Sequence, residues 1–231
     1  MALTFRPATA RPGRRRAAFL TQAEIVAAAA VVLERDGYDA LNMRAVAAEL
    51  GVQAAALYRH VESRAELDDR LFDHLMADCA PKLRGEDWRE DLKAVAGAWR
   101  RRLLERRDVT RIKLGQISIG PNIAPLMDAS LEALQRSGLS DADAVEIYQA
   151  YLIVVHGFAS AEASYRDLAS RPDGLRIAPL RPEWAAAYPT LSRLADRISA
   201  PADFETRFAF GLEAFIAGIE RRLATKEPRR R

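Results

Sequence analysis

The stretch Leu41–Val61, LNMRAVAAELGVQAAALYRHV, carries the most specific pattern in this chain of 231 residues. In its first half Val46, Ala47 and Leu50 fall at positions i, i+1 and i+4, which gathers them on one face of a helix. Gly51 follows directly, and a glycine there adopts the left-handed conformation at no steric cost. The pattern therefore predicts a short helix that ends in a tight turn.

A second short helix is predicted from about Gln53 to His60, with Leu57 and Val61 one turn apart on its inner face. Its outward positions carry small or polar residues, namely Gln53, Ala54, Tyr58, Arg59 and His60. Two short helices joined by a glycine-containing turn are typical of a helix-turn-helix. A second helix of this composition is narrow enough to enter the major groove of DNA.

Helices are predicted on both sides of this pair, and each begins with a capping box of the form T/S-x-x-E. One covers residues 21–36 and ends at Gly37, and the other covers residues 63–80. Pro81 and Gly85 then indicate the end of a first domain.

The order N-M-R-x-V-A-x-E-L-G-V-x-x-x-x-L-Y-R-H-V, after a helix ending in E-R-D-G-Y-D-A-L, resembles the signature of the tetracycline-repressor (TetR/AcrR-type) family of bacterial regulators. The resemblance spans roughly Thr21 to Met76. It implies an all-α fold, with an N-terminal three-helix helix-turn-helix DNA-binding domain and a C-terminal helical ligand-binding and dimerisation domain. It also implies a homodimeric repressor that binds a palindromic operator in double-stranded DNA. Binding of a small effector molecule would release the repressor from the operator.

Composition agrees with helices packed on helices, since 49% of the residues are hydrophobic but only 7% are aromatic. Cys79 is the only cysteine, so an internal disulfide is excluded and a reducing compartment is expected. No apolar run approaches the length of a membrane span, and a cytoplasmic location is therefore expected. Metal and cofactor sites are not predicted.

Charge is unevenly distributed along the chain. Residues 21–80 hold five arginines and eleven acidic residues, a balance of −6, whereas residues 42–61 hold only Glu49 against Arg44 and Arg59. DNA affinity must then come from the placement of charges rather than from the net field. The balance also leaves open an alternative, a helical ligand- or partner-binding module that has lost specific DNA reading.

The first twenty residues hold five arginines and no acidic residue, and their prolines argue against a stable helix. A disordered solvated tail and a basic arm that follows DNA phosphates both fit this composition. An organelle transit peptide is a third interpretation, although an amphipathic helix is missing. The predicted organisation is a disordered basic arm (1–20), a DNA-binding domain with its linking helix (21–80), a helical ligand-binding and dimerisation domain (81–225) and a disordered tail (226–231).

Within the third segment, helices are predicted over residues 88–105 and 140–165, and a last helix follows Asp203. Glycines and prolines interrupt residues 111–127, which suits either a pocket wall or an ordinary loop. Residues 171–189 contain too many prolines for one helix and are predicted as a surface loop with at most a turn around Trp184.

The candidate DNA-binding residues follow from the resemblance and from the chemistry of base edges and phosphates. Arg44, Tyr58, His60 and Arg64 are expected to hold phosphates, although a capping or core role for His60 stays open. Gln53, Ala54, Ala55 and Arg59 are expected to read bases. The backbone amides near Thr21 and Gln53 are expected to assist.

Two further candidate sets belong to the C-terminal helices. The effector-binding candidates are mostly apolar and suggest a hydrophobic or aromatic molecule: Trp99, Leu103, Ile117, Met127, Tyr151, Val155 and His156. The dimer-interface candidates form helical stripes: Tyr148, Phe158, Phe208, Leu212, Phe215 and Ile219. A rival interpretation, an enzyme, would have to use His156, Glu162 and Cys79, whose spacing matches no triad or metal site.

Overall fold

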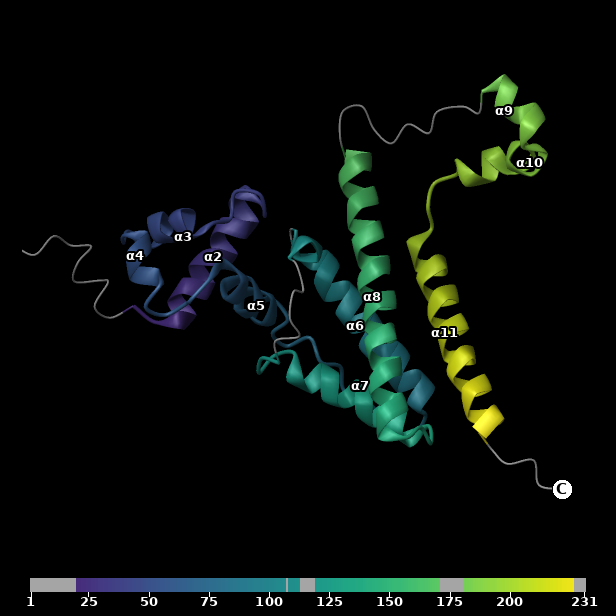
Figure 1. Cartoon of the computed structure of the whole chain (residues 1–231), viewed down its shortest axis with the longest axis horizontal. Helices are drawn as coiled ribbons and strands as arrows, with labels where there is room; N and C mark the ends of the chain where they lie inside the picture. Colours follow the sequence, from purple (N-terminus) through teal and green to yellow (C-terminus); the bar gives the residue numbers. More distant parts are fainter. Residues whose placement is uncertain (1–19, 107, 113–118, 171–180, 227–231) are drawn as a thin grey trace, which may run out of the picture. The chain divides into compact units, whose positions relative to one another are not determined.

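The computed structural model describes residues 20–106, 108–112, 119–170 and 181–226 of the chain (Figure 1). All elements within these ranges are helices, with no strand among them, which confirms the all-α prediction. The chain forms two compact units, Met1–Ser137 and Gly138–Arg231. None of the described helices is long and apolar enough to cross a membrane. The predicted arm, apart from Leu20, and the predicted tail, apart from Lys226, lie outside the described residues.

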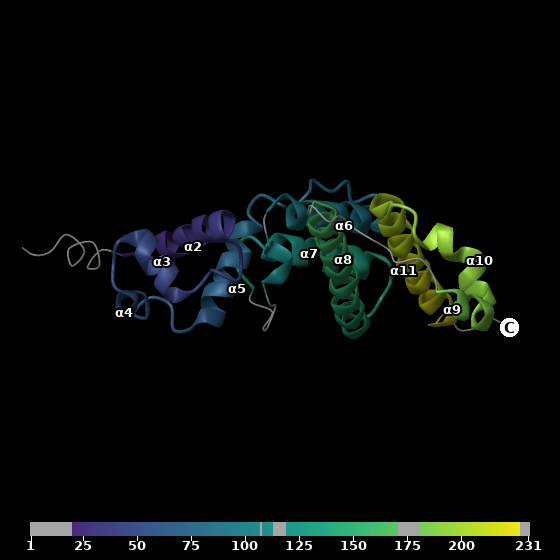
Figure 2. The ribbon, with the colours of Figure 1, turned by 90° about the horizontal axis from the view of Figure 1, so that it is seen from above.

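Four helices gather at the start of the first unit, in both the front view and the view from above (Figures 1 and 2). They are α2 (Gln22–Asp36), α3 (Met43–Leu50), α4 (Ala54–Leu57) and α5 (Arg64–Leu75). Their apolar stripes meet in a small core that includes the fully buried Val32, Val46, Leu57 and Leu67.

The caps at Thr21, Gly51 and Ser63 lie where the sequence predicts them, but the capping box at Ser63 is only half formed, because the Glu66 carboxylate accepts from the N–H of Glu62. Thr21 precedes α2, its hydroxyl accepts from the backbone N–H of Glu24 at 3.2 Å, and its own N–H donates to the Glu24 carboxylate at 2.9 Å. Gly51 ends α3 in the left-handed region, at φ 67° and ψ 31°. Ser63 caps α5 by accepting from the N–H of Glu66. That helix ends at Leu75, earlier than the predicted residue 80.

The rest of the first unit contains α6 (Trp88–Glu105), the 3₁₀ turn η1 (Val109–Arg111) and α7 (Ala124–Arg136). The bounds of α6 match the prediction, and Asp87 caps it by accepting from the N–H of Arg89. Helix α7 begins within the interrupted stretch 111–127, and the sequence pattern does not predict it.

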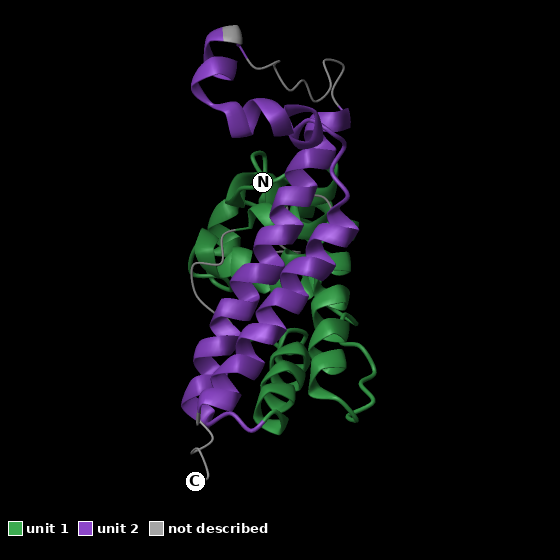
Figure 3. Cartoon of the chain, turned by 90° about the vertical axis from the view of Figure 1, so that its right-hand side faces the viewer, with its two compact units in different colours: residues 1–137 green, residues 138–231 purple. Residues whose placement is uncertain are grey.

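The second unit contains α8 (Asp141–Ser170), α9 (Pro182–Ala187), α10 (Pro189–Ile198) and α11 (Phe204–Lys226). Helices α8 and α11 lie side by side (Figure 3). The ring of Tyr165 near the end of α8 meets that of Phe204 at the start of α11 edge-on, with ring centroids 5.3 Å apart. Arg222 near the end of α11 forms an ion pair with Asp143 at the start of α8. The two helices are therefore antiparallel.

The predicted surface loop over residues 171–189 is wrong in its second half. Residues 171–180 lie outside the described part of the chain, but two short helices, α9 and α10, occupy residues 182–187 and 189–198. Pro182 and Pro189 each stand in the first turn of a helix, where the missing N–H leaves no intrahelical bond unmade.

Candidate nucleic-acid interface

The inner side of the helix-turn-helix is fixed by burial and by one long-range hydrogen bond. Leu57 and Val61 are fully buried under α4, as predicted. The side-chain amide of Gln22, at the start of α2, donates to the backbone carbonyl of His60 at 2.6 Å. Helix α2 therefore holds the far end of the segment that carries α4.

The outer side of this segment presents most of the predicted base readers. Gln53, Ala55, Tyr58 and Arg59 are exposed, with Tyr58 at 53%, whereas Ala54 is half-buried. The helix is shorter than the predicted range Gln53–His60, since residues 58–60 form a turn rather than a further helical turn. Short i to i+3 bonding explains the difference, because the N–H of His60 donates to the carbonyl of Leu57 at 2.9 Å.

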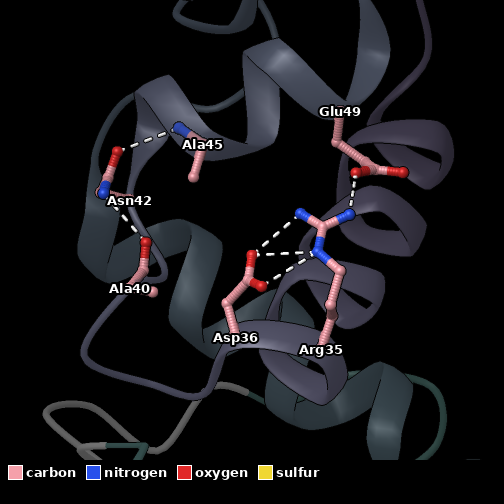
Figure 4. A network of polar contacts seen from close by, with 6 residues as sticks. All are labelled: Arg35, Asp36, Ala40, Asn42, Ala45 and Glu49. Carbon is pink, nitrogen blue, oxygen red and sulfur yellow. Dashed lines mark hydrogen bonds and ion pairs between the residues drawn. The ribbon is translucent and has the colours of Figure 1, made fainter.

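Asn42 fixes the start of α3 through both ends of its side chain (Figure 4). Its Oδ1 accepts from the N–H groups of Arg44 and Ala45, each at 3.0 Å, and its Nδ2 donates to the carbonyl of Ala40 at 2.9 Å. The same view shows Arg35 of α2 reaching Glu49 of α3 at 2.7 Å while also pairing with Asp36. These two carboxylates raise the pKa of the Arg35 guanidinium. Helices α2 and α3 are thus joined by polar contacts at the surface as well as by the core.

Replacing Asn42 with Ala is expected to lower the free energy of unfolding by about 1 kcal/mol, the usual cost of losing an N-cap side chain. Urea denaturation followed by circular dichroism would measure the loss. Asn42→Asp keeps both acceptor bonds to the amides and should retain most of the stability. Equal losses in the two variants would show that the cap contributes nothing.

Arg64 and Thr21 are engaged within the fold. The Arg64 Nε donates to the Asp68 carboxylate at 2.8 Å, a second guanidinium nitrogen donates to the Leu41 carbonyl, and the group lies 5.1 Å from the Tyr38 ring centroid. Its side chain is only 32% exposed. The structure therefore gives Arg64 a bracing role beside the helix-turn-helix, and the Thr21 N–H is already bound within its capping box. Among the predicted phosphate-binding side chains, Arg44 and Tyr58 are exposed and His60 is half-buried.

The effector-binding candidates divide between the two units. In the first unit Trp99 and Leu103 are buried on α6 and Met127 is half-buried on α7. In the second unit Tyr151 and Val155 are buried on α8 and His156 is half-buried there. Ile117 lies outside the described residues. The Trp99 indole N–H is buried and has no hydrogen-bond acceptor within the described part of the chain.

The dimer-interface candidates pack largely within their own unit. The Phe158 ring of α8 meets the Phe208 ring of α11 edge-on at 5.6 Å, and Tyr151 meets Phe215 at 6.1 Å. Gly211 lies against Phe158, since a Cβ on this glycine would come within 2.5 Å of the ring. Phe158 and Phe215 are half-buried, and the other four candidates are buried: Tyr148, Phe208, Leu212 and Ile219. The sequence stripe thus describes mainly the α8–α11 seam.

Cys79, one of the three residues that an enzyme would have to use, is poorly suited to act as a nucleophile. Cys79 is buried, its thiol donates to the carbonyl of Ala98, and burial raises the pKa of that thiol, which opposes formation of a nucleophilic thiolate. The described residues contain no group of three or more His, Cys, Asp or Glu side chains that could hold a metal ion.

The sequence profile described as "Bacterial regulatory proteins, tetR family" matches residues 25–71, and that described as "Tetracyclin repressor-like, C-terminal domain" matches residues 80–223. The chain belongs to the TetR family. As a member of this family it is a ligand-responsive DNA-binding transcriptional regulator and not an enzyme.

Individual relatives of this TetR-family chain match it over most of its length. The HTH-type transcriptional repressor DrrR1 of Streptomyces coeruleorubidus is 30% identical over 227 residues, which cover 91% of this chain and 81% of that protein. The structure of ActR from Streptomyces coelicolor in complex with actinorhodin has a TM-score of 0.70 and 32% identity, covering 87% of this chain and 96% of that one. BioQ with its double-stranded DNA operator has a TM-score of 0.63 and 25% identity, covering 87% and 98%.

Proposed function

We propose that this TetR-family regulator is a repressor that binds a palindromic operator as a homodimer and is released by a small hydrophobic or aromatic effector. The observation that carries the proposal is the exposed surface of Gln53, Ala55, Tyr58 and Arg59, held on a helix-turn-helix whose inner side is fully buried. Relatives support it, since BioQ was solved with its operator DNA. A palindromic operator places two half-sites in the symmetry that a homodimer has.

Two kinds of contact are expected at the DNA. Arg44 and Tyr58 would bind phosphates and set the position of the protein, while Gln53 would pair with an adenine and Ala55 would contact a thymine methyl group. Because three alanines follow Gln53, few side chains on this surface form hydrogen bonds. Specificity would therefore depend strongly on DNA shape and apolar contact.

Selection of bound duplexes from a random pool, at near-physiological salt, tests the proposal directly. Enrichment of a palindrome, bound with a steep salt dependence, is the expected result. Binding without any enriched sequence would favour the alternative, a regulator-like module that has lost specific DNA reading. Repeating the selection without residues 1–18 would show whether the basic arm adds affinity.

Replacing Gln53 with Ala is expected to reduce discrimination at one base position of each half-site by about 1–3 kcal/mol, the value of a good bidentate base contact. Competition binding with duplexes that differ at single positions would measure it. Gln135→Ala, at an exposed glutamine of α7, is the matched control and should change nothing. Uniform weakening over all sequences would instead assign Gln53 a phosphate or structural role.

The proposed dimer face is the exposed side of α8 and α11 rather than their buried seam. Ile153 and Val145 of α8 are 74% and 46% exposed, and Phe210 of α11 is 73% exposed. Large apolar side chains on neighbouring helices, left in contact with water, are typical of a protein–protein interface. We call residues 20–75, which contain the helix-turn-helix, the reading head. A second copy of the same chain, related by a twofold axis, would cover these apolar side chains and supply a second reading head.

The effector class rests on the chemistry of α6 and on one relative. Trp99 and Leu103 are large apolar side chains buried on α6, and the Trp99 N–H lacks an acceptor within the described residues. A buried donor without a partner costs about 1–3 kcal/mol, so an effector carrying an oxygen acceptor would gain by meeting it. ActR, which is similar to this chain, was solved with actinorhodin. Titrating actinorhodin into the protein–operator complex tests the class, and release is expected.

A further inference from the structure

The turn that follows α4 carries two of the expected DNA contacts, Tyr58 and Arg59, and the core holds it from beneath. Leu57 before the turn and Val61 after it are fully buried. The carbonyl of Leu57 accepts from the N–H of His60 at 2.9 Å and from the N–H of Val61 at 3.0 Å. These contacts tie the turn to α4 and to the apolar interior.

The same turn is also bonded from the side, by a residue of another helix. The peptide group between His60 and Val61 directs its N–H to Leu57, and its carbonyl accepts from the side-chain amide of Gln22 at 2.6 Å. Both ends of this peptide group are therefore bonded. Gln22 is exposed and His60 is half-buried, so the Gln22–His60 bond lies at the surface of the reading head.

The capping box of α2 fixes the backbone from which the Gln22 side chain extends. Gln22 is the first residue of α2. The N–H of Thr21 donates to the Glu24 carboxylate at 2.9 Å, and the Thr21 hydroxyl accepts from the Glu24 N–H at 3.2 Å. Because the box already orders the backbone around Gln22, the bond to His60 costs only the freedom of the glutamine side chain.

The Gln22–His60 bond requires a donor at residue 22. A backbone carbonyl can only accept, and the NH₂ group is the donating end of a glutamine side chain. Methionine has a similar length but offers no donor. Water can bond to a carbonyl that is exposed at the surface, so losing the glutamine would remove the tie between α2 and the turn while leaving the buried core intact.

The Gln22–His60 bond connects the two kinds of DNA contact. Phosphate contacts set the position of a protein on the duplex, and base contacts read the sequence. The backbone amides near Thr21 are expected to bind phosphate, and the capping box already uses those of Thr21 and Glu24. The first N–H groups of a helix have no partner within it, so this expected contact falls to the exposed Gln22 and Ala23.

We infer that Gln22 is a positioning residue for sequence reading, because its bond to the His60 carbonyl fixes the turn of residues 58–60 relative to the start of α2. This inference rests on the proposed function, since it requires residues 53–60 to read bases. In this role Gln22 acts through the turn and contacts no base. Base contacts depend on hydrogen-bond geometry and are lost when the turn shifts. Non-specific binding depends on phosphate charge and tolerates such a shift.

Hydrogen exchange followed by NMR, without DNA, tests the bond itself. Gln22→Met should accelerate exchange of the His60 and Val61 amides by about three- to tenfold, the factor that corresponds to one net hydrogen bond. Gln135→Met, at the exposed glutamine of α7, is the matched control and should leave these two amides unchanged. Unchanged exchange of both amides in Gln22→Met would overturn the inference.

The positioning role is tested by comparing two affinities at one salt concentration. One duplex is the sequence that the wild type selects from a random pool, and the other is a scrambled sequence of the same composition. Gln22→Met should weaken binding to the selected duplex about ten- to 100-fold, a factor of about three to ten at each of two half-sites. Binding to the scrambled duplex should change less than about twofold, because it depends on phosphate contacts.

A purely structural role for Gln22 gives a different pattern. Partial unfolding lowers the fraction of active protein and so reduces both affinities by the same factor. Equal losses on the two duplexes, or no loss on either, would overturn the positioning role. If the wild type selects no duplex at all, the proposed function fails and the positioning role fails with it. The exchange measurement uses no DNA, so it can overturn the inference while the proposed function stands.

Discussion

Phe210→Asp is expected to turn the proposed homodimer into a monomer and to abolish tight operator binding. The Phe210 side chain is 73% exposed on α11, so a carboxylate there would lie within the proposed interface. Burying an unpaired charge between apolar surfaces costs several kcal/mol. A monomer offers one reading head, and loss of the second contact should weaken operator binding on the order of 100-fold or more.

Light scattering coupled to size exclusion would show the change as a fall in mass from twice 25.6 kDa to 25.6 kDa. Leu191→Asp on α10, another exposed apolar position, is the control and should leave the dimer and the DNA affinity intact. Far-UV circular dichroism of Phe210→Asp should match the wild type, because the side chain contributes little to the core of its own unit. A dimeric Phe210→Asp protein with full DNA affinity would remove this face from the proposal.

Leu57→Ala is expected to lower the stability of the reading head by about 2–5 kcal/mol, the range for truncating a buried leucine. Leu57 is fully buried beneath α4, where it is the main apolar anchor of a helix only four residues long. The resulting cavity would leave the segment that carries Gln53 and Arg59 without its main apolar contact. DNA binding should therefore be lost together with the unfolding of the reading head, which urea titration would measure.

The same substitution at Leu168 provides the comparison, because Leu168 is 41% exposed on α8. Leu168→Ala should cost less than about 0.5 kcal/mol, as surface changes usually do. If the two variants lose the same stability, then α4 is not anchored through Leu57.

Local sequence patterns predicted the reading head well because its elements are decided by short-range chemistry. The T-x-x-E capping box, the left-handed Gly51 and the inward face of Val46, Leu50 and Leu57 all follow from residues within one or two turns. The same reasoning missed α7, α9 and α10, since it treated prolines as breakers. Pro125, Pro182 and Pro189 each stand in the first turn of a helix, where proline is tolerated.

Contacts between distant residues could not be predicted in this way. The role of Arg64 at a phosphate stays a prediction, but its contacts with Leu41 and Tyr38, more than twenty residues away, come together only in the folded domain, whereas its pair with Asp68 is a local i,i+4 contact. Likewise, a stripe such as Phe208, Leu212 and Ile219 predicts a buried helix face without saying whether the covering helix belongs to the same chain. The cap that Asp73 supplies to α7, 49 residues away, has no local signal at all.

The hydrogen bond from Gln22 to the carbonyl of His60 joins residues 38 positions apart, across the whole helix-turn-helix. A four-residue helix cannot nucleate by itself, because its first turn fixes several backbone angles for a single hydrogen bond. Helix α4 therefore depends for its stability on contacts with the rest of the domain, among them this bond to α2. DNA reading should consequently appear and vanish in one cooperative step with the folding of the entire head, with no partially folded form that still recognises an operator.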